Sequence, residues 1–360
     1  MTTEITIAAV GDILMKPLMT ATMRKAGTND YDFGDVFEPV ASYLRDADLT
    51  IGNLETTFAG LKSTLKPGDS GEHVYTKSRR NPKTRNPVFN SPDEFAKTLQ
   101  QHGFDVLTTA NNHCMDYGIK GLNRTLRVLD TQGIAHTGTN RNLKESRKLL
   151  VRDVKGIKVG VLAYTRDTNS IPVPKDRAWA VNRISPSKIK ADIDRLKAKA
   201  DIIIVCLHFG YEYHKKPSVS QKKLVRLLFK YGSDVVLGSH PHVIQPAVFV
   251  RTKDQSGISK KRFAIYSLGN FVCTRLHGND HTLNGVIVRL KVRKTKSGSL
   301  LLANAEYIPT WVSRTGTGDQ MKYQIVPLKQ ALSYPKVAAV ENKRMKRIHR
   351  HFLSHIRRKY

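Results

Sequence analysis

Short apolar runs that alternate with longer polar segments limit the possible folds of this chain more than any other feature of its sequence. The run at 202–207 has the length of a buried strand and is far too short to cross a bilayer. The segment at 93–102 follows a Ser-Pro-Asp start signal, which predicts a helix. Strands that alternate with helices in this way predict an α/β layered fold.

The same patterns place the other elements. We expect strands at 5–10, 49–54, 104–109, 157–164, 202–207 and 235–237, and helices at 37–44, 93–102, 122–129, 187–200 and 222–231. The runs at 263–268 and 286–292 alternate apolar and polar residues, which predicts half-buried antiparallel strands.

Two segments depart from this alternation. Residues 62–86 form a long polar stretch that carries Arg79 and Arg80, and loops of this length in compact domains are usually functional or mobile. Near the C-terminus, apolar residues recur along one helical face, with Lys and Arg on the other; they are Met345, Ile348, Phe352 and Ile356. We expect this helix to dock on the domain; the alternative is a surface helix that binds a polyanion or a membrane. The predicted organisation is a single domain at 1–330 and a basic amphipathic helix at 331–360.

Polar residues of ligand type follow the predicted strands. Because the crevice beyond the strand ends is where open α/β sheets bind ligands, we expect these side chains to meet there. They are Asp12, Glu55, Asn112, His208, His240 and His242. Taken singly, each has a plainer interpretation as a turn or helix cap, or as a buried histidine with both nitrogens satisfied. Their joint placement favours a metal site.

The mixture of carboxylate, amide and imidazole groups suits one or two divalent transition metals such as Mn, Fe or Zn. Two metals bridged by one carboxylate can hold a phosphoryl group and activate a water between them. The three cysteines lack metal-binding spacing, so a structural zinc site is not expected.

Seven ordered motifs between about residues 5 and 275 resemble the CapA (PgsA) bacterial capsule synthesis family, whose members are associated with poly-γ-glutamate capsule. The motifs are Gly11-Asp12, Asn53-Leu54-Glu55, Phe89-Asn90-Ser91-Pro92, and the stretches at 110–118, 207–213, 238–246 and 266–271. The family is similar to calcineurin-type metallophosphoesterases. This resemblance implies a four-layer α/β/β/α sandwich with the site at the strand ends.

The resemblance also implies a role for each residue. Asp12 would bind the first metal, Glu55 would bridge both, Asn112 and His208 would bind the second, and His240 and His242 would be split between them. His113 would be the general acid, oriented by Asp116, although a purely structural role is the alternative for His113. Candidate substrate-binding residues are Asn53 and Glu212 in the motifs and Arg79 and Arg80 in the basic stretch.

The chain departs from the phosphoesterase pattern at two positions. Leu14 stands two residues after Asp12, where these enzymes usually carry a histidine, so the first metal loses a ligand. Glu55 replaces the usual bridging aspartate, which gives the carboxylate a longer reach.

Lys and Arg total 60 against 30 acidic residues, and a formal charge of +30 attracts polyanions. The first functional hypothesis is a metal-dependent hydrolase of a phosphoester or a γ-glutamyl or amide bond. The second is a non-catalytic binder or assembly factor for poly-γ-glutamate. The third is a nucleotide or nucleic-acid phosphodiesterase, which is less favoured because no recognition motif accompanies the basic stretch.

The start of the chain lacks the basic and apolar segments of a signal peptide, and no apolar run is long enough for a transmembrane helix. The odd cysteine count agrees with a reducing compartment. We therefore expect a cytoplasmic location without the N-terminal anchor that is common among CapA-like proteins.

Overall fold

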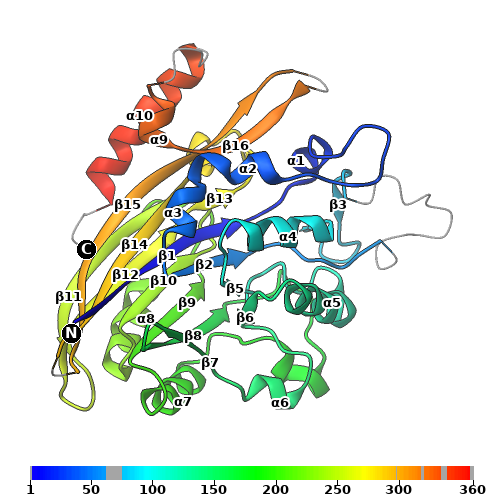
Figure 1. Cartoon of the computed structure of the whole chain (residues 1–360). Coiled ribbons are helices and arrows are strands. Elements are labelled where there is room, and N and C mark those ends of the chain that lie inside the picture. Colours follow the sequence, from blue (N-terminus) through cyan, green and yellow to red (C-terminus); the bar gives the residue numbers. More distant parts are fainter. Residues whose placement is uncertain (1, 62–74, 297, 318–319, 334–338, 357–360) are drawn as a thin grey trace.

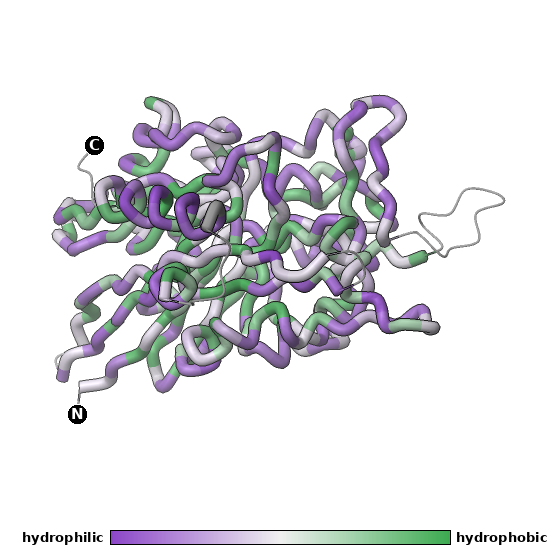
Figure 2. Tube along the Cα trace, turned by 90° about the horizontal axis from the view of Figure 1, so that it is seen from above, coloured by the Kyte–Doolittle hydropathy of each residue, from purple (hydrophilic) through white to green (hydrophobic). Residues whose placement is uncertain are grey.

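Two β-sheets form the centre of the molecule, and helices cover their outer faces (Figure 1). The computed structural model describes residues 2–61, 75–296, 298–317, 320–333 and 339–356. Hydrophobic stretches gather toward the centre and hydrophilic stretches lie at the periphery (Figure 2). Among the described residues, no helix combines the length and the apolar character needed to cross a membrane.

The first sheet has eight strands. Seven follow the order β16-β15-β14-β1-β2-β5-β6, and β13 pairs with β1. β1, β2, β5 and β6 run parallel, whereas β14, β15 and β16 continue the sheet antiparallel. Their bounds are β1 (Thr3–Ile13), β2 (Leu49–Leu54), β5 (Val106–Thr108), β6 (Ala135–Thr137), β13 (Asn270–Val272), β14 (Asn284–Lys294), β15 (Leu300–Thr315) and β16 (Lys322–Pro327).

The second sheet has six strands in the order β11-β12-β10-β9-β8-β7. β8, β9, β10 and β12 run parallel, and the edge strands β7 and β11 are antiparallel to their neighbours. Their bounds are β7 (Leu150–Val154), β8 (Ile157–Thr165), β9 (Ile202–His208), β10 (Val235–Ser239), β11 (Ile244–Lys253) and β12 (Ser259–Leu268). A separate two-stranded ladder joins β3 (Arg79–Arg80) and β4 (Pro87–Val88).

Helices connect most of the parallel strands. The α-helices are α1 (Pro17–Ala21), α2 (Gly34–Phe37), α3 (Ala41–Arg45), α4 (Asp93–Gln101), α5 (Gly118–Thr131), α6 (Leu143–Ser146), α7 (Pro186–Lys197), α8 (Val219–Tyr231), α9 (Leu328–Ala331) and α10 (Ala339–His355). Three 3-10 turns are η1 (Glu38–Val40), η2 (Lys175–Ala180) and η3 (Asp280–Leu283).

The alternating side chains of β1 show why the first sheet is covered on both faces. Ile5 and Ile7 point into a core that also contains Ile204 of the second sheet. Ala8 and Val10 point the other way, into a core shared with α2, α3 and α4. Successive strand residues face opposite sides of the sheet. A strand with apolar residues at both odd and even positions therefore requires a covering layer on each side.

The second sheet is covered in the same way. Val205 and Leu207 of β9 pack against Ile193 of α7 and Leu228 of α8. Full burial of such an aliphatic side chain stabilises the fold by about 1.5–3 kcal/mol. The layers therefore follow the order helix, sheet, sheet, helix, and the four-layer α/β/β/α sandwich expected from the sequence is confirmed.

Two local predictions need correction. The helix expected at 37–44 is divided among α2, η1 and α3, because Pro39 cannot donate the backbone hydrogen bond of a continuous helix. The strand at 263–268 is not half-buried, since Phe263 to Leu268 are at most 4% exposed. This part of β12 lies inside its sheet, with β10 parallel on one side and β11 antiparallel on the other. In β14 the expected alternation appears only after Val288.

The C-terminal helix α10 docks on the sandwich, as one of its two interpretations predicted. Met345 and Ile348 pack with Trp311 of β15, and Phe352 and Ile356 join the core between the sheets. The division of the chain into a domain at 1–330 and a helix at 331–360 stays a prediction. Of the predicted polar loop, residues 62–74 lie outside the described part of the chain.

Candidate metal centre

All six predicted metal ligands lie in the crevice at the carboxyl ends of strands from the two sheets. Each side chain is buried, with at most 6% of its surface exposed. Asp12 is in β1, Glu55 directly follows β2, Asn112 follows β5, His208 ends β9, and His240 and His242 follow β10. The strand-end placement expected from the sequence is what the tertiary structure shows.

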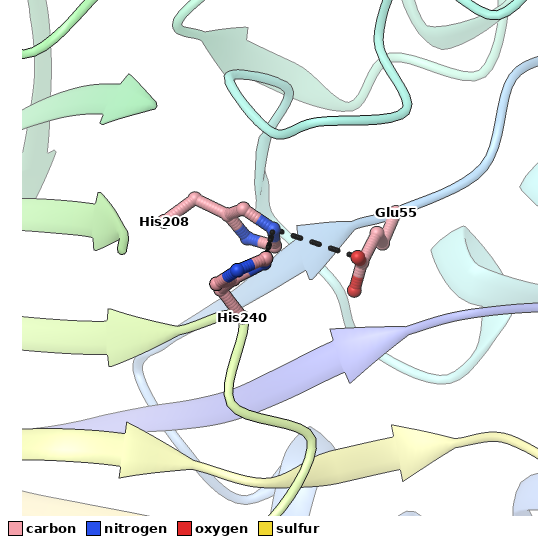
Figure 3. Close-up of side chains that lie close together, drawn as sticks. All are labelled: Glu55, His208 and His240. Carbon is pink, nitrogen blue, oxygen red and sulfur yellow. Dashed lines mark hydrogen bonds and ion pairs between the residues drawn. The ribbon is translucent and has the colours of Figure 1, made fainter. Parts of the chain in front are cut away.

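One group within this crevice contains Glu55, His208 and His240 (Figure 3), and one ligand atom of each lies within 4.8 Å of the others. Nε2 of His208 lies 3.2 Å from Nδ1 of His240 and 3.5 Å from Oε1 of Glu55. It also lies 2.7 Å from Oδ1 of Asn112. A carboxylate, an amide oxygen and two imidazoles that converge in this way suit a divalent first-row metal.

A second group contains Asp12, Glu55 and His242, again with one ligand atom of each within 4.8 Å of the others. Oδ2 of Asp12 lies 3.2 Å from Nδ1 of His242, and Oε1 of Glu55 lies 3.9 Å from Nε2 of the same ring. Because Glu55 belongs to both groups, its carboxylate is common to the two candidate sites.

The environment of Glu55 tests whether a cation fits. Both carboxylate oxygens are buried, and neither forms a hydrogen bond with any residue that the structure describes. Burial, together with the nearby Asp12 carboxylate, raises the pKa of Glu55 well above its ordinary value. A buried carboxylate that accepts no hydrogen bond is costly, and a divalent cation shared by the two groups would compensate it. The residues therefore fit the expected metal.

The histidines differ in charge state. Burial lowers the pKa of His208 and of His240 to about 3, so both rings are neutral and have lone pairs available at neutral pH. Burial also disfavours the charged form of His242, but the Glu55 and Asp12 carboxylates outweigh it and raise the pKa of His242 to about 9. Metal binding here would therefore release protons.

The loop that carries His240 and His242 is strained. Both residues have left-handed backbone conformations, with φ of 96° and 58°. Such conformations cost a non-glycine residue about 1–3 kcal/mol each and concentrate at functional sites. Oδ1 of Asn270 lies 2.9 Å from Nδ1 of His242, the nitrogen that also lies near Asp12, and accepts its proton. This contact leaves Nε2 of His242 directed at Glu55.

The backbone before Asp12 passes very close to the turn that carries Asn270. A Cβ atom at Gly11 would lie 1.9 Å from the carbonyl oxygen of Gly269, and the Asp12 N–H donates to that same oxygen at 3.0 Å. Only glycine permits this approach, which holds Asp12 and Asn270 side by side in adjacent strands.

The two remaining residues of the motif after β5 form a buried pair. Nδ1 of His113 lies 2.9 Å from Oδ2 of Asp116, which also accepts the backbone N–H of Phe89 at 2.7 Å. Burial lowers the pKa of His113, but the Asp116 carboxylate raises it above its ordinary value. The Asp116 carboxylate thus favours the protonated imidazole, and Nε2 remains free of Asp116.

The four predicted substrate-binding residues lie in different places. Nδ2 of Asn53 donates to Oδ1 of Asp12 at 2.8 Å and lies 3.3 Å from His208, so this side chain supports the predicted ligands. Glu212 lines a cavity beside His240. Arg79 and Arg80 form β3 and do not line that cavity. Substrate contact stays a prediction for all four.

Leu14 occupies an apolar cluster rather than an open coordination position. Its side chain is 2% exposed and packs with Phe89, Cys273 and Leu276. The missing histidine ligand is thus replaced by hydrophobic packing.

Sequence reasoning missed Asn169, which follows β8. Its Oδ1 accepts from Nδ2 of Asn112 at 3.0 Å, and its Nδ2 lies 3.4 Å from Nε2 of His113. Asn169 therefore directs the amide oxygen of Asn112 toward His208 and joins the predicted metal ligand to the predicted acid. The signal was available, because Arg166-Asp167-Thr168-Asn169 follows an apolar strand just as the other site residues do.

Comparison with known proteins supports the sequence resemblance. The chain is 28% identical over 295 residues to "Capsule biosynthesis protein CapA" of Bacillus anthracis, covering 81% of this chain and 64% of that protein. It is 28% identical over 297 residues to "PGA biosynthesis protein CapA" of Bacillus subtilis (strain 168), covering 80% and 68% respectively. The chain thus spans less than two thirds of the length of the Bacillus anthracis relative.

Among solved structures, a putative 5'-nucleotidase from Staphylococcus aureus in complex with alpha-ketoglutarate matches with a TM-score of 0.50 and 14% identity. The match covers 97% of this chain and 58% of that one, and it shows a shared fold alone. The model of the family "Bacterial capsule synthesis protein PGA_cap" matches residues 6–275. The chain therefore belongs to this bacterial capsule synthesis protein family.

Proposed function

We propose that this chain is a metal-dependent hydrolase that cleaves a phosphoester or a γ-glutamyl or amide bond in poly-γ-glutamate-related metabolism. The observation that carries the proposal is Glu55, whose two buried oxygens accept no hydrogen bond from the described residues and which belongs to both groups of metal-ligand type. The names of the two Bacillus relatives, which refer to capsule and PGA biosynthesis, support the pathway.

Divalent cations bound at the two groups would supply activation of a water and polarisation of the substrate. Asn112, oriented by Asn169, would present its amide oxygen to the centre. His113 would give a proton from Nε2 to the departing oxygen or nitrogen as water adds to phosphorus or to the carbonyl carbon. Asp116 would hold the ring in place through Nδ1.

The test of this proposal is the metal content of protein purified without added metal. We expect about one or two equivalents of transition metal per chain, one if the absence of a histidine at Leu14 weakens the first site. Glu55→Ala removes the carboxylate common to both groups and should lose this metal. Elemental analysis measures both proteins, and Glu306→Ala, which removes an exposed carboxylate from β15, should keep the wild-type content.

Absence of metal from the wild-type protein, even after reconstitution with Mn, would exclude the hydrolase. Metal retained in Glu55→Ala would instead show that the cation lies elsewhere.

A second candidate function, non-catalytic binding of poly-γ-glutamate, is favoured by the formal charge of +30. Affinity for the polymer would then fall steeply with ionic strength, because a polymer with one carboxylate per residue binds mainly through long-range attraction. A titration between low and high salt, with and without chelator, measures this. An affinity that does not change with salt concentration, or that is lost when chelator is added, would count against the second candidate.

A further inference from the structure

A polar cavity of about 540 Å³ opens directly beside His240. The loop after β8 forms one wall, and Tyr211 and Glu212 after β9 form another. Two arginines, Arg166 and Arg183, also line it. Neither arginine belongs to the two groups of predicted metal ligands.

The backbone brings both arginines to the strand ends that carry the metal site. Thr165, the last residue of β8, pairs with His208 in β9 and forms a parallel bridge with Arg183. The N–H of Arg166 donates to the carbonyl oxygen of His208 at 3.0 Å. Arg166 and Arg183 are thus connected through Thr165 to the strand end that presents His208.

The guanidinium of Arg166 is held in place before any ligand arrives. Nη1 donates to the carbonyl oxygen of Gly210 at 2.7 Å, and Nε donates to Oδ2 of Asp167 at 3.0 Å. Its central carbon lies 5.8 Å from the centre of the Tyr211 ring. The side chain is nevertheless 49% exposed, so part of the guanidinium faces the cavity.

Arg183 is exposed to solvent and is not held by a described carboxylate as Arg166 is. Within the part of the chain that the structure describes, no carboxylate lies within 4 Å of its guanidinium, which donates only a 3.4 Å hydrogen bond to the carbonyl oxygen of Arg166. The cavity lining also contains the carboxylates of Asp167 and Glu212, and Asp167 is already paired with Arg166. An exposed guanidinium next to a second, fixed one favours a ligand with oxyanion character.

Planar guanidinium groups bind carboxylate and phosphate oxygens through paired, charge-assisted hydrogen bonds. We propose that Arg166 and Arg183 form an oxyanion subsite that holds an anionic group of the substrate while the neighbouring bond lies at the metal centre. The proposal rests on the hydrolase function above. The substrate class it implies carries a second anionic group next to the bond that is cleaved, either a carboxylate, as in γ-linked glutamate, or a further phosphate.

The subsite can be tested by binding, apart from turnover. Calorimetric titrations of the whole 360-residue chain with a γ-linked glutamate trimer and with pyrophosphate give the two affinities. Salt at about 0.15 M screens non-specific attraction. We expect Arg183→Gln to weaken binding of at least one probe about tenfold or more, because a charge-assisted pair is lost. Arg183→Lys should recover only part of the loss, since a lysine lacks the guanidinium fork.

Arg127→Gln is the matched control, because Arg127 is exposed on α5 and the change removes the same charge. It should bind both probes as wild type does. Loss for the trimer alone would assign a carboxylate to the subsite, and loss for pyrophosphate alone would assign a phosphate. Wild-type affinity in Arg183→Gln for both probes, equal losses in Arg127→Gln, or no binding of either probe by the wild type would each overturn the proposal.

Repeating the titrations after metal removal separates this inference from the proposed function. The arginines do not contribute to the metal groups, so the fold-change between wild type and Arg183→Gln should persist in chelator and their metal contents should match. An Arg183-dependent affinity in a protein that never binds metal would remove the hydrolase and leave the subsite. Metal-dependent turnover together with wild-type affinities in Arg183→Gln would support the hydrolase and exclude the arginine subsite.

Discussion

Replacing His113 with alanine is expected to lower turnover by about 10²–10⁴-fold and to leave the bound metal unchanged. The His113 side chain is 6% exposed, and Asp116 holds Nδ1 at 2.9 Å. A substrate would therefore meet Nε2, which lies 3.4 Å from the Asn169 amide. Asp116 raises the pKa of His113 above its ordinary value despite burial. The Asp116 carboxylate therefore stabilises the protonated form of the ring, which is the form that can give a proton to the leaving atom.

The measurement is the rate of hydrolysis of a chromogenic phosphodiester and of a γ-glutamyl anilide by reconstituted protein, together with elemental analysis of each variant. His136→Ala removes a half-buried histidine that pairs with the exposed Asp130 outside both ligand groups, and this variant should keep the wild-type rate. Turnover that survives His113→Ala would assign the histidine a structural role. A parallel loss of metal would instead show that it supports the ligand Asn112.

Replacing Arg262 with methionine is expected to destabilise the fold by about 3–5 kcal/mol without weakening the metal centre. Arg262 is 0% exposed and lies near the start of β12, at the opposite end of the strand from the site. It donates to the Ser233 carbonyl at 2.5 Å and to Oδ2 of Asp254 at 3.1 Å, and it lies 3.5 Å from Asp234. Methionine would leave the Asp254 and Asp234 carboxylates without their buried cation.

Unfolding by urea, followed by circular dichroism, measures the effect as a lower midpoint. Lys260→Met is the matched control, because Lys260 lies on the same strand and also pairs with Asp234 at 3.5 Å but is 36% exposed along its side chain. Exposed pairs contribute at most about 1 kcal/mol, so this variant should unfold close to the wild type. Equal midpoints for the two variants would contradict the importance of the buried pairing.

Much of the sandwich could be predicted from the sequence, because its parallel strands are continuous apolar runs. The runs that form β1, β2, β8, β9 and β10 are buried on both faces of their sheets. Such strands are recognisable from the continuous apolar composition of the sequence. β15 and β16 were not predicted. Their residues pair antiparallel with β14 and with each other at the edge of the first sheet, and several face solvent, so the apolar signal is weak.

The sequence by itself determined which residues end the strands, since each polar group directly follows an apolar run. It thereby indicated Asp12, Glu55, Asn112, His208 and the His240–His242 pair as a set. The tertiary structure decided which of them meet, because the contacts join residues far apart in the chain. The His240 N–H, for example, donates to Oδ2 of Asp12 across 228 positions.

The packing of the two sheets places Asn169 beside His113, and it places Arg166 and Arg183 around the cavity beside His240. These residues lie in irregular loops, whose course depends on hydrogen bonds such as that from Arg166 to His208 rather than on any periodic pattern. Strand periodicity is a local property of the chain and can be read directly. The meeting of loops at a shared edge depends on the register and packing of both sheets, and those exist only in the folded protein.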